Sequence, residues 1–463
     1  MTALGAKIVA ARAVGSLARR SGRGGGTSLP GKLLIRFEPA AISELARRLP
    51  RGTAVISATN GKTTTAAMTA SIMAHAGVRL VHNQAGANMA GGIASTLLVA
   101  AQRGGGIDGE LGIFEVDEFW LDRMAAELRP RALVLSNLFR DQLDRYGELE
   151  TIADRWSGVV AALPAGTRLV LNADDPLVAD LGRDAPDVTL FGVEDSSVAL
   201  PEMQHASDSK HCRRCGAAYR YEAIYLGHLG RYHCPVCGQR RPQPEIAAEA
   251  IRLAGTASAE FTLRTPEGRR AVRLPLPGLY NVYNALAAAG LCLALGATLD
   301  EVVSGLEAVK AAFGRAETLD VAGTELSILL IKNPAGANEI LRTLALEEGE
   351  LHILAVLNDH TADGRDVSWV WDADFELLCG HIASATCAGT RAAELALRLK
   401  YAGVPTDRLR VVGDLPAALD EALASASGRL FALPTYTALL ALQQELARRG
   451  HAGQYWSGRR EAA

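Results

Sequence analysis

Ala54-Val-Ile-Ser-Ala-Thr-Asn-Gly-Lys-Thr-Thr-Thr65 leads from an apolar, strand-forming run through a glycine into a helical pattern. Gly-Lys-Thr at a strand-to-helix turn is typical of a phosphate-binding loop, in which backbone N–H groups at the helix N-terminus surround phosphates. Lys62 would neutralise phosphate charge, and a hydroxyl of Thr63 or Thr64 would bind Mg²⁺. The usual loop begins with a glycine where this chain has Ile56. The stretch therefore predicts a nucleotide-binding α/β domain with a shortened loop.

Short β-rich runs alternate with longer Ala- and Leu-rich helical segments on both sides of this loop. Such alternation predicts parallel strands joined by crossover helices, and a second series beyond Gly314 predicts a separate Rossmann-like domain of roughly 150 residues. A long helix is expected over residues 282–295. The expected strands are 53–57, 111–116, 132–136, 168–171, 259–265, 270–274, 327–331, 352–357, 381–387, 409–412 and 429–432.

These patterns divide the chain into three parts. Residues 1–40 form an N-terminal helix and a Gly-rich segment, which is either a flexible linker or a loop that folds over a ligand. Residues 41–312 form a central ATP-binding domain with a cysteine-bearing insertion at 205–244, and residues 313–463 form a C-terminal α/β domain.

Composition limits the possible functions. The 463 residues are 49% hydrophobic and 21% charged with a net charge of −3, which indicates a globular enzyme and does not favour a nucleic-acid partner. The apolar runs are too short to span a membrane, and the first 20 residues lack the apolar core of a signal peptide. We expect a cytoplasmic protein whose contact with the inner face of the membrane is at most peripheral, through a basic N-terminal helix that is otherwise simply solvated.

Four of the seven cysteines form two CxxC pairs, Cys212 with Cys215 and Cys234 with Cys237, 18 residues apart. Each pair is followed by a glycine, as in the knuckles of a zinc ribbon. Four thiolates bind Zn²⁺ tetrahedrally in a closed structural site, and the alternative is a redox role for either pair. The pattern predicts an inserted hairpin held together by structural zinc, because so short an excursion cannot build its own core.

Several fragments between residues 53 and 317 resemble the Mur ligases and folylpolyglutamate synthetases, whose ATP-binding turn has the same shortened glycine spacing. The resemblance implies that ATP phosphates bind the turn formed by Thr59, Asn60, Gly61, Lys62, Thr63 and Thr64. It implies that Mg²⁺ is bound by Glu115, which ends a strand where the family has a metal-binding glutamate, together with Thr63. Asn281 and Asn284 would lie near the adenine, and Arg315 near the phosphates or ribose.

The cysteine-bearing insertion and several C-terminal fragments extend the resemblance to the MurT family, the Mur-ligase-like subunits of lipid II isoglutaminyl synthases. The fragments are Lys332–Asn338, Asn358–Asp366, Thr390–Ala392 and Pro434–Thr437. The resemblance implies ATP- and glutamine-dependent amidation of the D-glutamate α-carboxylate in the lipid II stem peptide to D-isoglutamine, through an acyl phosphate, in peptidoglycan biosynthesis. No counterpart of the nucleotide-sugar domain of Mur ligases precedes the loop, which favours a lipid-linked substrate.

A source of ammonia is expected outside the chain. Cys292, Cys379 and Cys387 lack the Gly-flanked elbow of a glutaminase nucleophile and are expected in the core. The resemblance implies a heterodimer with a GatD-type class I glutaminase subunit, whose catalytic histidine is oriented by an aspartate of the MurT-type chain. We assign this role to Asp366, with Asp363 second, although acids here are also expected to cap the next helix.

Two other functions fit parts of the pattern. One is a stand-alone ATP-dependent ligase that adds an amino acid or glutamate to a peptide or folate-like substrate. The other is a nucleotide-switched binding protein whose zinc ribbon holds nucleic acid or another protein.

Overall fold

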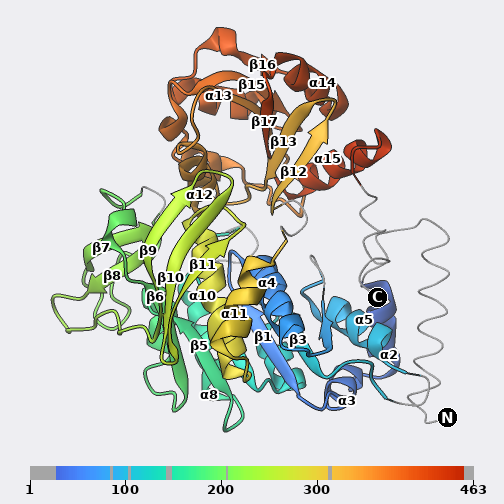
Figure 1. Ribbon diagram of the computed structural model, residues 1–463, viewed down its shortest axis with the longest axis vertical. Coiled ribbons are helices and arrows are strands. Elements are labelled where there is room, and N and C mark those ends of the chain that lie inside the picture. Colours follow the sequence, from blue (N-terminus) through green and yellow to red (C-terminus); the bar gives the residue numbers. More distant parts are fainter. Residues whose placement is uncertain are drawn as a thin grey trace.

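The computed structural model describes residues 28–83, 87–102, 106–141, 149–204, 207–310 and 315–452, apart from the side chains of Arg315 and Ala316. Two α/β units, each built on its own sheet, lie one above the other (Figure 1). The N-terminal helix and most of the Gly-rich segment expected before residue 28 lie outside the described residues.

The larger sheet has the strand order β11-β10-β9-β6-β5-β4-β1-β3-β2. In this order the strands from β9 through β6, β5, β4, β1 and β3 to β2 run parallel to one another. β9, β10 and β11 form an antiparallel meander at one edge. The strands are β1 (Thr53–Ser57), β2 (Leu80–His82), β3 (Leu111–Glu115), β4 (Ala132–Leu135), β5 (Arg168–Asn172), β6 (Val188–Val193), β9 (Ile246–Ala254), β10 (Ser258–Thr265) and β11 (Gly268–Leu274).

Helices cover both faces of this sheet, so its central strands are apolar throughout. In β1, Ala54 and Ile56 enter one core and Val55 enters the other, as the two-residue period of a strand requires. The first core is covered by α4 (Lys62–His75), α10 (Leu279–Ala294) and α11 (Leu299–Glu307). The second is covered by α2 (Leu29–Phe37), α3 (Ala41–Ala46), α5 (Ala90–Ala100), α6 (Leu121–Leu128), α8 (Leu149–Ala161) and α9 (Pro176–Leu181).

Helix α2 is part of this second core although it lies before residue 40. Leu34 of α2 is fully buried there. A Cβ atom at Gly31 would lie 2.0 Å from the carbonyl oxygen of Gly91 in α5, so the two helices approach backbone to backbone. The N–H group of Gly31 donates a hydrogen bond to Ser95 Oγ at 2.8 Å. The described part of the N-terminal segment is therefore packed against the central domain.

The smaller sheet has the order β12-β13-β17-β14-β15-β16, with only its first pair antiparallel among the described strands. Its strands are β12 (Arg315–Val321), β13 (Thr324–Leu329), β14 (Leu351–Val356), β15 (Ile382–Ala388), β16 (Leu409–Val411) and β17 (Arg429–Pro434). Its helices are α12 (Pro334–Leu344), α13 (Ala392–Tyr401), α14 (Leu415–Ser425) and α15 (Tyr436–Arg448). This unit also contains the short 3₁₀ turns η2 (Ser368–Trp371), η3 (Phe375–Leu378) and η4 (Thr406–Arg408), whereas η1 (Ser196–Val198) follows β6 of the larger sheet.

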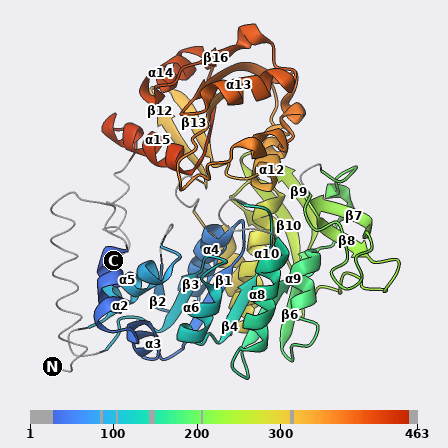
Figure 2. The same cartoon turned by 180° about the vertical axis from the view of Figure 1, so that it is seen from behind.

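The cysteine-bearing insertion leaves the larger sheet between β6 and β9 and forms a two-stranded hairpin of β7 (Arg220–Leu226) and β8 (Leu229–His233). Figures 1 and 2 show it at the side of the central unit, with α12 at the lower edge of the C-terminal unit. Within the described ranges, no helix combines the length and apolar character needed to cross a membrane.

The α/β fold class predicted from the sequence is confirmed. The strands expected at residues 53–57, 111–116, 132–136 and 168–171 agree with β1, β3, β4 and β5 to within one residue, and the long helix begins three residues earlier than expected. Strands β2, β6, β9 and β12 were not expected. β2 is only three residues long, and β9 contains Glu249 and Arg252, which disguise its apolar pattern.

Candidate nucleotide site

The phosphate loop connects β1 to α4 through Gly61, which caps the helix in a left-handed conformation with φ of +89°. A Cβ atom at Gly61 would lie 2.0 Å from Oδ1 of Asn284, so glycine is required by the backbone and by this neighbour. Asn284 accepts a hydrogen bond from Thr65 Oγ1 at 3.3 Å and donates one to Asn281 Oδ1 at 3.0 Å. Asn284, held by Asn281 of the same helix, therefore packs against the phosphate loop at Gly61 and Thr65.

The other side of the loop is fixed by the segment that follows β4. Asn137 accepts from the N–H of Asn60 at 2.9 Å and donates to its carbonyl oxygen at 3.0 Å. Thr59 donates its N–H to the carbonyl of Asn137, and its hydroxyl oxygen accepts from the N–H of Phe139 at 3.1 Å. These contacts hold the loop in shape without any ligand.

The side chain of Lys62 is buried and forms an ion pair with Glu118 at 2.7 Å, and its Nζ also donates to the carbonyl of Ala58. Burial alone lowers the pKa of Lys62, but the negative charge of Glu118, reinforced by Asp117 and Glu115, outweighs burial and raises that pKa. Burial alone raises the pKa of Glu118, and the nearby lysines lower it below its ordinary value. The pair is therefore ionised on both sides.

Three acids gather at the carboxyl end of β3: Glu115, Asp117 and Glu118. Asn83 fixes the backbone of Glu115 by accepting its N–H at 2.9 Å and donating to its carbonyl at 2.8 Å. All three acids line the same pocket as Thr63 and Thr64. Carboxylate and hydroxyl oxygens are the donors that Mg²⁺ prefers, so this set of residues fits a magnesium ion beside the phosphate loop.

The C-terminal unit closes the pocket over the loop. Lys332 forms an ion pair with Asp141 and donates to the carbonyl of Thr59 at 3.2 Å. The side-chain amides of Asn60 and Asn333 exchange two hydrogen bonds, at 3.0 and 3.2 Å. The phosphate loop is thus joined directly to the N-terminal end of α12, where Asn333 is the helix cap.

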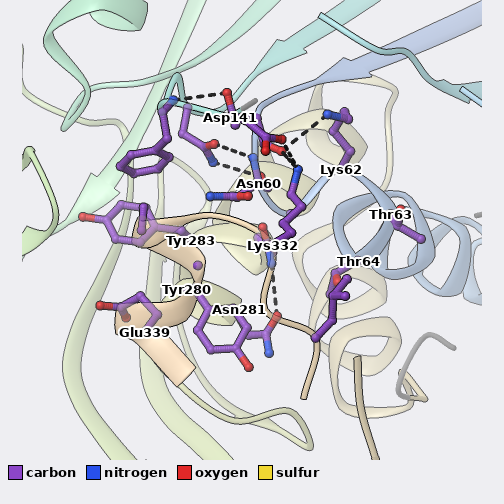
Figure 3. Close-up of a pocket in the computed structure, with 18 of the residues that line it drawn as sticks. Asn60, Lys62, Thr63, Thr64, Asp141, Tyr280, Asn281, Tyr283, Lys332 and Glu339 are labelled. Atoms are coloured by element: carbon purple, nitrogen blue, oxygen red, sulfur yellow. Dashed lines mark hydrogen bonds and ion pairs between the residues drawn. The ribbon is translucent and has the colours of Figure 1, made fainter. Parts of the chain in front are cut away.

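The cavity has a volume of about 430 Å³, within the range of small-molecule sites. Figure 3 shows Lys62, Thr63 and Thr64 on one side of it, and Tyr280, Tyr283 and Glu339 on the other. The cavity is also lined by Phe139, Leu226 and Leu229, the last two from the hairpin tip between β7 and β8. One side is therefore suited to phosphates, and the aromatic and aliphatic lining is suited to a ring.

The residues predicted from the sequence fall into two groups. Thr59, Asn60, Gly61, Lys62, Thr63, Thr64, Glu115, Asn281 and Asn284 all line this cavity. Arg315 begins β12, where it pairs with Leu329, and its side chain lies outside the described residues. Further residues of the site were not predicted from the sequence: Glu118, Asn137, Asp141, Lys332, Asn333 and Glu339. Lys332 and Asn333 stood in a fragment similar to the MurT family, but their sequence gives no signal that they meet the phosphate loop.

The two candidate aspartates are not among the residues that line this cavity. Asp363 is buried, and its carboxylate accepts hydrogen bonds from the N–H and the hydroxyl of Thr437, at 2.7 and 2.5 Å. Asp366 is exposed and accepts the N–H of Ser368 at 2.8 Å, and hydrogen bonds from Ser368 lower the pKa of Asp366. Thr437 lies in the first turn of α15, so Asp363 caps that helix, and Asp366 is the more accessible of the two acids.

The four cysteines of the insertion meet at one point, with all Sγ atoms within 4.8 Å of one another. Gly216 and Gly238 have φ of +76° and +75°, and their N–H groups donate to the carbonyls of Cys212 and Cys234 at 2.7 and 3.1 Å. This pair of knuckles is the arrangement that a tetrahedral Zn²⁺ requires, so the four thiols fit a metal ion.

The arginines beside the knuckles bind the central unit. Arg214 pairs with Asp180 at 2.6 Å and Arg213 pairs with Asp154. Arg241 pairs with Glu194 at 2.6 Å and with the fully buried Asp174. These ion pairs attach the cysteine-bearing insertion to α8, to α9 and to the segments that follow β5 and β6.

Comparison with known proteins agrees with this geometry. Residues 56–234 match the family described as the Mur ligase middle domain, and residues 330–439 match MurT ligase C-terminal. A pseudomurein peptide ligase type C from Methanothermus fervidus superimposes with a TM-score of 0.67 at 22% identity, covering 87% of this chain and 79% of the other. Folylpolyglutamate synthase of Mycobacterium tuberculosis, solved with ADP and AMPPCP, gives a TM-score of 0.59 at 18% identity, covering 91% and 98%.

The fold and the phosphate loop thus define a protein of the Mur ligase class, whose relatives bind adenine nucleotides. The subunit MurT of lipid II isoglutaminyl synthase (glutamine-hydrolyzing) from Streptococcus pneumoniae is 32% identical over 443 residues, 96% of each chain. The chain belongs to the MurT family. The resemblance inferred from the sequence is therefore confirmed.

Proposed function

We propose that this chain is the ATP-activating subunit of a lipid II isoglutaminyl synthase. It amidates the α-carboxylate of D-glutamate in the stem peptide to give D-isoglutamine. The observation that carries the proposal is the joining of the phosphate loop to a MurT-type C-terminal domain around one cavity that residues of both units line. Near full-length similarity to MurT subunits supports the choice of substrate.

The chemistry requires activation of a carboxylate, because oxide is too poor a leaving group for ammonia to displace. A carboxylate oxygen attacks the γ-phosphorus of ATP, the bond to the β–γ bridging oxygen breaks, and ADP leaves. Ammonia then attacks the acyl carbon, loses a proton, and inorganic phosphate departs. Charge stabilisation at the transferring phosphoryl group is the main contribution that protein residues can make.

In this proposal, backbone N–H groups from Thr59 to Thr64 and the ammonium group of Lys62 hold the phosphates. Lys332 approaches the same loop from the C-terminal unit and supplies a second positive charge. Thr63 and Glu115 would hold Mg²⁺, which when bound neutralises phosphate charge, and Glu118 is a further candidate ligand. We retain Arg315 near the phosphates or ribose, and Asn281 and Asn284 beside the nucleotide, with Asn284 also supporting Gly61.

Ammonia would come from a separate glutaminase subunit, in keeping with the description of the relatives as subunits. Asp366 is our candidate for orienting the catalytic histidine of that subunit. Its exposure supports this choice, whereas both carboxylate oxygens of Asp363 are used by Thr437. A glutaminase of GatD type is the partner we propose.

An exposed aromatic cluster lies on the elements that follow Asp366. Trp371 of η2 and Tyr401 of α13 are 47% and 70% exposed, and their rings meet edge to face at 5.8 Å. Leu397 of the same helix is also exposed. Aromatic side chains of this kind are enriched in protein interfaces, which supports this face as the docking surface for the glutaminase.

The test uses the full chain with lipid II, MgATP and ammonium chloride. We expect release of ADP and formation of an amide without the glutaminase, and glutamine-driven turnover once a GatD-type subunit is added. Asp366→Asn should abolish glutamine-driven turnover and spare the ammonium reaction. Turnover with a free amino acid in place of ammonium would instead favour a stand-alone ligase, and failure to form ADP or amide would overturn the proposal.

A further inference from the structure

Glu339 is a buried acid whose charge is only partly compensated. It lies in the second turn of α12 and is 2% exposed. Its Oε1 atom has no hydrogen-bond partner among the described residues. The nearest cation, Arg342, lies 3.8 Å from Oε1 and donates its own hydrogen bonds to the carbonyls of Tyr225 at 2.8 Å and Val198 at 2.5 Å. Leaving a buried polar oxygen unpaired costs about 1–3 kcal/mol, which points to a ligand that pairs with it.

The position of Glu339 indicates which part of a ligand it meets. It lines the cavity that contains the phosphate loop, and Figure 3 shows it next to Tyr280 on the side away from Lys62 and Thr63. Aromatic and aliphatic side chains line the same cavity, and they include Phe139 and the hairpin residue Leu229. An elongated ligand with its phosphates at Lys62 would therefore bring its ring system towards Glu339.

We infer that Glu339 recognises the amino edge of the adenine ring and makes the site selective for ATP. This rests on the nucleotide-binding function proposed above. The unpaired Oε1 would accept a hydrogen bond from the 6-amino group of adenine. Guanine carries a carbonyl at that position, so its 6-substituent cannot donate a hydrogen bond to Oε1.

The environment of the carboxyl supports this role. Burial raises the pKa of Glu339 to about 7, and Arg342 offsets only part of that effect. Near neutral pH the group is therefore protonated in a substantial fraction of molecules. A protonated carboxyl offers one donor and one acceptor side by side, which matches the amino group and an adjacent ring nitrogen of adenine.

The role can be tested by removing the hydrogen bond from each side. Binding of MgATP and of the magnesium complex of purine riboside triphosphate, which lacks the 6-amino group, is measured calorimetrically for wild type, Glu339→Leu and Glu339→Gln. Wild type should prefer ATP about tenfold, equivalent to about 1.4 kcal/mol. Glu339→Leu should lose this preference, and Glu339→Gln, which keeps an acceptor and a donor, should retain most of it.

Magnesium tripolyphosphate serves as a probe without a base, and its affinity should be the same in all three proteins if the phosphate loop is intact. A preference for ATP that persists in Glu339→Leu would overturn the inference, as would equal wild-type affinity for the two nucleotides. If Glu339→Leu does not fold, wild type and Glu339→Gln still test the inference. Equal affinity of wild type for the two nucleotides, with no change in Glu339→Gln, would overturn it. Wild type that binds neither nucleotide would reject the proposed function itself and the inference with it.

Discussion

The phosphate loop and the cysteine knuckles both depend on glycines with positive φ, but they are held in different ways. Gly61 is crowded by Asn284, and its loop is hydrogen bonded to both α/β units. Gly216 and Gly238 have nothing within 4 Å of a Cβ position among the described atoms, and the cluster beside them consists of four thiols. The loop is preorganised by the protein, whereas the knuckles bring together four thiols that a metal ion would link.

The strongest test of this contrast removes the charge from the loop. Lys62→Ala should lower both ammonium- and glutamine-driven turnover by roughly 10³-fold or more, because the cation at the transferring phosphoryl group is lost. Bound zinc should be unchanged, since the knuckles do not contact this residue. ADP release and metal analysis measure the two effects. The exposed Lys310→Ala serves as the matched control and should behave as wild type; near-normal turnover of Lys62→Ala would remove this lysine from the mechanism.

A paired glycine substitution compares the two turns directly. Gly61→Ala places a methyl group against Asn284 and strains a residue with φ of +89°, and we expect about 100-fold weaker binding of MgATP. Gly238→Ala strains a similar turn, with φ of +75°, but meets open space and should cost only about 1 kcal/mol of stability. Nucleotide titration and thermal melting measure both variants. Equal effects at the two positions would contradict the contrast.

Removal of zinc should affect the knuckles first and the nucleotide second. A chelator, or Cys212→Ser combined with Cys237→Ser, should lower the melting temperature by roughly 5 °C, because the ion that links the two knuckles would be lost. Because Leu226 and Leu229 line the cavity from the hairpin, affinity for MgATP should fall by a smaller factor than in Gly61→Ala. Protein that contains no zinc when purified in the presence of zinc salts would count against the metal site.

The smallest expected effect concerns the joint between the two units. Asn60→Ala, Asn333→Ala and the double variant form a cycle for the pair of amide hydrogen bonds. We expect a coupling of roughly 1 kcal/mol in the binding of MgATP. Additive effects of the single changes would show that closure of the C-terminal unit does not depend on this pair.

Much of the fold follows from local sequence pattern. β1, β3, β4 and β5 are short apolar runs flanked by turns, so their limits could be predicted closely. β2 and β6 were missed because only Val81 of the short β2 and the second half of β6 are buried, and a strand with so few buried residues carries a weaker hydrophobic signal.

The candidate site divides in the same way. Gly61 to Thr64 form a continuous motif, and the CxxC pairs have a spacing specific to metal sites. Asn137 lies 77 positions from Asn60, and Asn333 lies 273 positions away, so no local pattern links them to the loop. The local sequence of Glu339 is that of an ordinary helical acid, and its burial results from tertiary packing, which the sequence does not reveal.

The ion pair between Lys62 and Glu118 also determines which form of nucleotide the site should accept. An anion that arrives alone can draw Lys62 away only by leaving Glu118 buried without its ion-pair partner, which is costly. A nucleotide that carries its own divalent cation offers a new partner to each residue at once. Binding then becomes an exchange of partners in which the number of buried charges without a counterion stays constant, so free phosphate and metal-free ATP should be poor competitors.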